Sequence, residues 1–118
     1  MIDTERAILA IAIQHPEFID TILANCDDEF FKWMENQKIY EKIKDLREGK
    51  SLTDWETIID LLKGEISASW FTAMQDTLKG SYPMGIEPLL LEKIKLVKED
   101  KAKRAILSEI NKELLGHM

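Results

Sequence analysis

The feature of this sequence that most constrains its fold is the stretch from Leu89 to Leu115, which contains neither proline nor glycine. These two residues normally interrupt helices. Proline lacks a backbone N–H group, and glycine loses more conformational freedom on folding than any other residue. A helix in a globular protein averages about 11 residues. The sequence therefore predicts one much longer helix, over residues 88–118.

The composition indicates that the other elements are helices too. The chain has 118 residues, 45% of them hydrophobic, which is enough for one core but not for two ordinary domains. Five glycines and three prolines are few for a β-rich protein, which needs frequent turn residues. We expect an all-α fold, in which a compact bundle of five or six short helices (residues 1–80) and a linker loop (81–87) precede the long C-terminal helix (88–118).

Breakers divide the first part of the bundle into helices. A first helix, apolar almost all round, is expected to begin at Asp3 or Thr4, either of which can cap it, and to lie deep in the core. His15 should end it, because the residue before proline disfavours the α conformation. A second helix should then run from Pro16 to about Leu23.

Spacing and capping residues predict the next two helices. Apolar residues three and four positions apart favour a helix from Met34 to Glu48, with Gly49 as its left-handed C-terminal cap. Thr53 and Glu56 have the spacing of a capping box, in which each side chain bonds to the backbone N–H of the other residue. This box predicts a helix over residues 54–63.

Glycine and serine mark the end of that helix and the limits of the next one. Gly64 should close the helix over residues 54–63. Ser67 or Ser69 should cap the following helix, which ends before Gly80. The bundle is thus predicted to end where the linker loop begins.

The long terminal helix is expected to be amphipathic and to project beyond the bundle. Four consecutive charged residues, 98–101, interrupt its apolar positions, and we expect the helix to leave the body there. A projecting amphipathic helix must cover its remaining apolar face with another helix or another chain. The residues expected to form this self-association interface are Leu90, Ile94, Val97, Ile106, Ile110 and Leu114.

The charge distribution favours a protein partner over nucleic acid. The net charge is -6, and residues 1–86 carry nine Lys and Arg against sixteen Asp and Glu, whereas residues 87–118 carry seven against six. An acidic body repels a phosphate backbone, so we expect no direct binding of nucleic acid. Four cations of the long helix are candidates for contacting a partner protein, with a merely solvated face as the alternative: Lys98, Lys101, Lys103 and Arg104.

No residue set in the sequence predicts catalysis, a cofactor or a metal. Gly49-Lys50-Ser51 copies the end of a phosphate-binding loop, but Lys44 stands where that loop needs glycine, and no strand precedes it. Two histidines and one cysteine are too few for a zinc site, and the clustered carboxylates and aromatic residues fit helix capping and core packing. The single Cys26, with no signal peptide and no long apolar stretch, predicts a cytoplasmic protein without a disulfide or a membrane span.

Three stretches, read in order, resemble the head domain of DnaB-type replicative DNA helicases. Residues 5–10 and 15–20 are similar to the opening helix and the Asp/His-Pro-Glu junction of that family. Residues 31–49 resemble its Phe, Ile-Phe/Tyr and Ile-x-x-Leu pattern ending in glycine, and residues 52–62 resemble its next capped helix. Residues 104–107 look like part of the first arm of the family's helical hairpin.

The resemblance implies a non-catalytic collar domain rather than an enzyme. Such domains pair through their hairpins, assemble as a ring above the motor, and offer a docking surface to primase or a helicase loader during DNA replication. The sequence departs from the family at Asn36, where histidine is frequent, and the second hairpin arm and the motor domain lie outside these residues. Two alternatives remain: the helicase-binding C-terminal domain of a primase, and a small phage protein that binds the host helicase.

Overall fold

All elements in the described part of the chain are helices, as the sequence predicted. The computed structural model describes the backbone of residues 1–80 and 84–116, and side chains as far as Lys112. The elements follow in the order α1 (Ile2–Gln14), η1 (Pro16–Phe18), α2 (Ile19–Asn25), α3 (Met34–Glu48), α4 (Trp55–Leu61), α5 (Ala68–Asp76) and α6 (Ile86–Gly116), where η1 is a short 3-10 helix.

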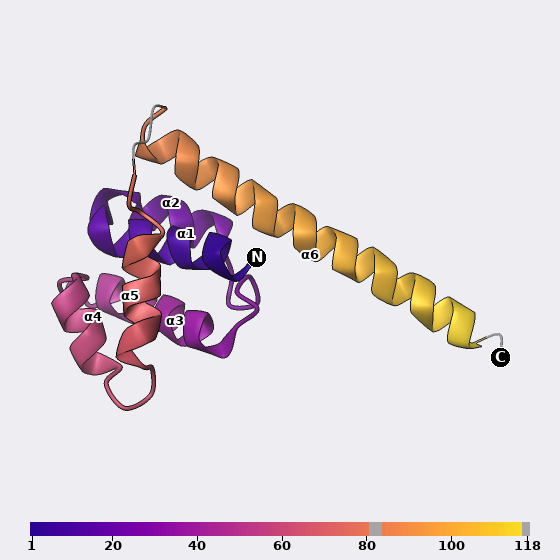
Figure 1. Cartoon of the computed structure of the whole chain (residues 1–118), viewed down its shortest axis with the longest axis horizontal. Helices are drawn as coiled ribbons and strands as arrows, with labels where there is room; N and C mark the ends of the chain where they lie inside the picture. The colour runs from indigo at the N-terminus through magenta and orange to yellow at the C-terminus, as the bar shows by residue number, and fades with distance from the viewer. Residues whose placement is uncertain (81–83, 117–118) are drawn as a thin grey trace.

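Helix α1 forms the centre of the core because it is apolar on almost every side. All side chains from Ala7 to Ile13 are buried, and α1 lies against α3, α5 and α6 (Figure 1). Fully burying an isoleucine or leucine contributes about 1.5–3 kcal/mol, so α1 is a main source of stability. No single helix in the described residues is long and apolar enough to cross a membrane, although α1 with η1 and α2, bent by 112°, would pass on length and composition alone.

The helix ends near the N-terminus differ in part from the prediction. Helix α1 begins at Ile2, so Asp3 lies inside its first turn and complements the helix dipole instead of capping the helix. His15 ends α1 as expected, with φ -128°. The single helix expected from Pro16 is a 3-10 turn followed by α2, which continues to Asn25.

Helix α3 has the predicted limits, but its C-terminal cap and the N-terminal cap of α4 differ from the prediction. Gly49 has φ -79°, and the left-handed residue is Lys50, with φ +56°. The N-cap of α4 is Asp54, whose carboxylate accepts a hydrogen bond from the Thr57 backbone N–H at 2.9 Å. The predicted capping box is therefore wrong, because Thr53 is buried and the cap lies one residue later.

Glycines with positive φ follow α4 and α5. Gly64 has φ +91° and Gly80 φ +123°, conformations in which a residue without a Cβ avoids strain. Ser67 is the N-cap of α5, but its hydroxyl lies 3.0 Å from that of Ser69 and makes no capping bond to the backbone. The predicted positions of these turns are confirmed, and the side-chain cap is not.

Helix α6 begins at Ile86, so the last two residues of the expected linker are helical, and residues 81–83 lie outside the described part. Pro88 fits the first turn, where its missing N–H breaks no helical bond. At 1.5 Å per residue, α6 is about 46 Å long. Figure 1 shows its first half lying along the body and its second half extending past it.

Candidate protein-binding surfaces

The first half of α6 is part of the protein's own core. Leu90, Ile94 and Val97 are 0%, 3% and 2% exposed, and they join the cluster around α1. Their spacing of four and then three residues places them on one side of the helix. These three members of the predicted interface are therefore covered by the same chain.

The second half of α6 presents its apolar residues on the opposite side. Each residue turns an α-helix by about 100°, so Ile106 lies about two and a half turns beyond Val97 and faces away from the body. Ile106 is 60% exposed and Ile110 46% exposed. The six predicted residues thus do not form one stripe, and the side chain of Leu114 lies outside the described part.

Leu107 also belongs to the exposed apolar surface, although it is not among the six residues predicted as the self-association interface. It is 59% exposed and lies one turn from Ile110. We call Ile106, Leu107 and Ile110 the distal face. A helical register counted from Leu90 would have revealed this face and its half-turn offset, because only residue numbers are needed.

The four predicted partner-contact cations are all exposed, but two of them are engaged within the chain. The Lys101 ammonium donates a hydrogen bond to the backbone carbonyl of Glu29 at 2.6 Å. Arg104 forms an ion pair with Asp100 at 3.0 Å, one helical turn earlier. Lys98 and Lys103 share the exposed surface of the same helix, so all four lie around the point where α6 leaves the body.

The loop before α3, which Lys101 contacts, is fixed to the body by buried groups. Glu5, only 2% exposed, accepts hydrogen bonds from the Lys32 backbone N–H at 3.0 and 3.2 Å. The Tyr40 hydroxyl donates to the backbone carbonyl of Cys26 at 2.6 Å. Burial raises the pKa of the Cys26 thiol to about 12, which favours the neutral thiol at neutral pH.

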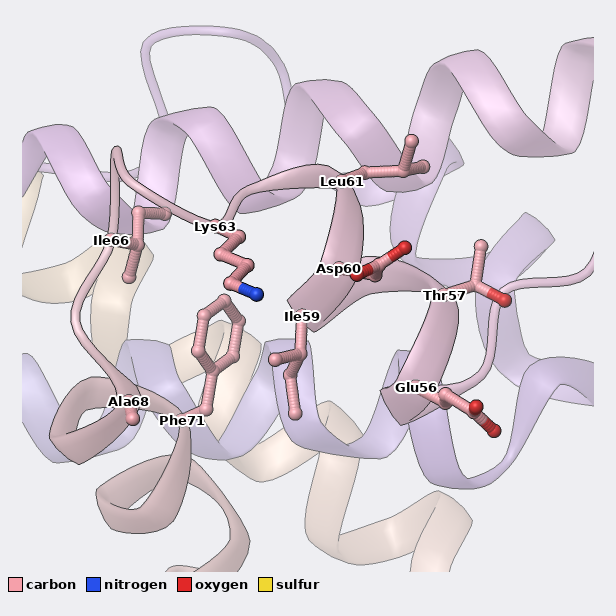
Figure 2. A pocket seen from close by; sticks show the side chains of 9 residues that line it. All are labelled: Glu56, Thr57, Ile59, Asp60, Leu61, Lys63, Ile66, Ala68 and Phe71. Atoms are coloured by element: carbon pink, nitrogen blue, oxygen red, sulfur yellow. The ribbon is translucent and has the colours of Figure 1, made fainter.

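A second surface is the open hollow between α4 and α5, with a volume of about 740 Å³, which we call the α4–α5 hollow. In Figure 2, the side chains of Ile59, Phe71 and Lys63 converge on the space between the two helices, and Glu56 and Asp60 come from α4. Its walls are thus mainly apolar, with carboxylates along one rim. The lining residues are Glu56, Thr57, Ile59, Asp60, Leu61, Lys63, Ile66, Ala68 and Phe71.

The segment that forms this hollow is acidic. Residues 51–78 contain five carboxylates, at positions 54, 56, 60, 65 and 76, and one cation, Lys63. The Thr57 N–H bond at the N-terminus of α4 keeps the pKa of the Asp54 carboxyl below its usual value, so that carboxylate stays charged at neutral pH. An apolar hollow with an acidic rim suits an apolar side chain that a basic segment presents.

These surfaces have features that protein interfaces commonly have. Among the residues whose side chains are described, 1–80 and 84–112, no group of three or more His, Cys, Asp or Glu could hold a metal ion. The distal face and the α4–α5 hollow are open, apolar and edged by charge, as protein interfaces commonly are. The helix that carries the distal face was predictable from the sequence, whereas the α4–α5 hollow was not, because it depends on how two helices pack.

One of the comparisons with known proteins identifies a family. The family described as DnaB-like helicase N terminal domain matches residues 1–82, which is the body without α6. No curated protein and no solved structure gives a significant match. Because the family match covers more than half of the chain, this protein belongs to the DnaB-like helicase N-terminal domain family.

Proposed function

We propose that this domain mediates oligomerisation of a replicative DNA helicase and docks primase or a helicase loader during DNA replication. The family match supports the helicase assignment and speaks against the alternative of a primase C-terminal domain. The domain contributes contacts between proteins, and the motor chemistry belongs elsewhere in such a helicase. The cations around the exit of α6 and the distal face are the surfaces that serve these contacts.

One observation carries the oligomerisation: the distal face is apolar, exposed and turned away from the body that could have covered it. Ile106 and Ile110 are about half exposed or more, whereas Leu90 on the same helix is fully buried. Contiguous exposed apolar side chains on a projecting helix mark a protein contact, because water contact is unfavourable for them. We therefore assign the self-association contact to the distal face, and not to the buried half of α6.

Sedimentation velocity over a range of protein concentrations tests this assignment. Ile106→Glu or Ile110→Glu should weaken self-association, because each places a charge in the apolar contact. Ser108→Glu is the matched control, since Ser108 lies between them in sequence but on the other side of the helix. Unchanged association of the Ile106→Glu and Ile110→Glu chains would contradict the assignment.

A pull-down tests the docking role. The immobilised domain should retain primase or a helicase loader, and Lys98→Glu together with Lys103→Glu should weaken that capture. Lys79→Glu, which changes an exposed cation that follows α5 and does not belong to α6, is the control. Capture of a helicase ring in place of primase would instead favour a primase-type domain, and equal capture by all variants would sink the role of the α6 cations.

A further inference from the structure

We propose that the hydrogen bond from Lys101 to the Glu29 backbone carbonyl fixes the direction in which the second half of α6 leaves the body. We call it the exit bond. It joins the point of exit to the loop before α3, residues 26–33. Figure 1 shows this loop on the side of the body along which α6 departs. The inference concerns the angle of the projection and does not depend on what the distal face binds.

Lys101 lies where the contact between α6 and the body ends. Among the side chains of α6 described as far as Lys112, it is the last that bonds to the body. Val97, the last buried one, precedes it by four positions, or about one turn, so both face the body. Arg104 lies about one further turn along and pairs with Asp100 of the same helix.

The carbonyl that accepts the exit bond belongs to a loop that is itself held in place. The Glu29 backbone N–H donates to the Asp27 carboxylate at 3.0 Å, and the Phe30 backbone N–H donates to the Asp27 carbonyl at 3.1 Å. Phe30 and Phe31 are 4% and 1% exposed. The Gln37 amide donates to the Phe31 carbonyl at 2.7 Å. A bond to a fixed acceptor ties the helix to the body, which a bond to a freely moving loop would not do.

The length of α6 gives this one bond a large effect on the projection. Without it, apolar contacts from Ile86 to Val97 hold about 16 Å of helix, and about 28 Å extends freely to Gly116. Such contacts are not directional. With the exit bond, the held and the free spans are each about 22 Å. The movement of the tip of a rigid rod scales with the free span divided by the held span, so the bond reduces it about 1.7-fold.

This role differs from the one that the sequence predicted for Lys101. The cation was expected to contact a partner protein, whereas its ammonium lies 2.6 Å from an acceptor of its own chain. A hydrogen bond with a charged donor is stronger than one between neutral groups, so Lys101 suits this position better than a neutral side chain would.

Distances between spin labels on the body and on the projection test the inference. One label is attached at Thr72→Cys in α5 and the other at Asn111→Cys in α6, both exposed positions of the full chain. The native Cys26 is buried and therefore shielded from the label. An excess of unlabelled chain keeps labelled copies apart, so double electron–electron resonance measures the distance within one chain.

Three substitutions of α6 cations separate the exit bond from the general charge of the helix. Lys101→Met removes the donor but keeps the length of the side chain, so the distance distribution should broaden about 1.7-fold. Lys101→Arg keeps charged donors and should leave the distribution narrow. Lys103→Met is the matched control, because it makes the same change on the side of α6 that is turned from the body. The melting temperature should fall by less than about 5 °C in each, since all are exposed positions.

The loop offers a second test of the same bond. Asp27→Ala removes the acceptor of the Glu29 N–H and should also broaden the distribution. Asp28→Ala, which removes the neighbouring exposed carboxylate, should not. Asp27→Ala combined with Lys101→Met should broaden it no further than Lys101→Met alone, because both act through the exit bond.

Three outcomes would overturn the inference. An unchanged distribution in Lys101→Met would show that the apolar contacts alone fix the helix. Equal broadening in Lys103→Met would show that the charge of α6 sets its direction. Additive broadening by Asp27→Ala and Lys101→Met would show that the loop acts by another route. Self-association is measured separately by sedimentation, so its failure and the failure of the exit bond are distinguishable.

Discussion

At the scale of single residues, the most informative side chain is the buried carboxylate of Glu5. It receives the Lys32 backbone N–H and the Asn36 amide, which in turn accepts a hydrogen bond from the Trp70 indole N–H at 3.0 Å. One polar network therefore links α1, the loop before α3, α3 itself and α5. Buried charges persist only with such partners, because desolvation penalises them otherwise.

Replacing Glu5 by alanine should lower the free energy of unfolding by about 2–3 kcal/mol, since the Lys32 N–H and the Asn36 amide lose their acceptor inside the protein. Glu5→Gln should cost less, because one acceptor oxygen remains. Urea denaturation followed by circular dichroism measures both. Asp3→Ala, an exposed position of the same helix, is the control, and an equal loss there would refute the role of the network.

At the scale of elements, the sequence predicted where helices lie better than how they end. The limits of α3 follow from apolar spacing, which local sequence records. The N-cap of α4 does not follow from the local sequence, because Thr53 is buried and Asp54 caps the helix in its place. The burial of Glu5 was equally invisible, since its backbone partner Lys32 lies in a distant part of the sequence.

The end of α3 tests whether Lys50, as in the structure, or Gly49, as predicted from the sequence, is the left-handed residue. Lys50→Gly should raise the free energy of unfolding by up to about 1 kcal/mol, because Lys50 and not Gly49 is left-handed. Gly49→Ala should change it by less than about 0.5 kcal/mol, since a Cβ there would come only within 3.4 Å of the Asp45 carbonyl. Thermal melts of both variants test this expectation. A large loss of stability in Gly49→Ala would mean that Gly49 is the left-handed residue, as the sequence predicted.

The two halves of α6 should differ sharply in their contribution to stability. Leu90→Ala should lower the free energy of unfolding by about 2–5 kcal/mol, because it leaves a cavity in the core. Ile106→Ala should lower it by less than about 0.5 kcal/mol at a concentration where the chain is monomeric. Chemical denaturation compares them, and similar losses would show that the distal face is covered within the chain.

At the scale of the whole molecule, the protein is a body that could fold without its projection. The described side chains from Ala102 to Lys112 are all exposed, so the core does not depend on them. The absence of breakers after Pro88 predicted the length of this helix, and the charged residues 98–101 predicted where it leaves the body. It did not predict the α4–α5 hollow, because a hollow is a property of the space between helices and not of any one helix.

A chain ending at Lys101 should therefore keep its melting temperature and lose its self-association. The truncation retains the Lys101 bond to Glu29 and the buried half of α6. Calorimetry measures the first property and sedimentation the second. A fall of the melting temperature by more than about 5 °C at low concentration would show that the distal segment supports the body.

The buried and the exposed apolar side chains of α6 lie half a turn apart around the helix axis. The number of residues between them therefore determines the direction in which a neighbouring copy is bound. One extra residue between Val97 and Ile106 would swing an attached neighbour by about 100° around the helix axis, whereas seven would return it almost to its starting direction. Insertions in this segment would thus bend or straighten an assembly while every contacting side chain stayed the same.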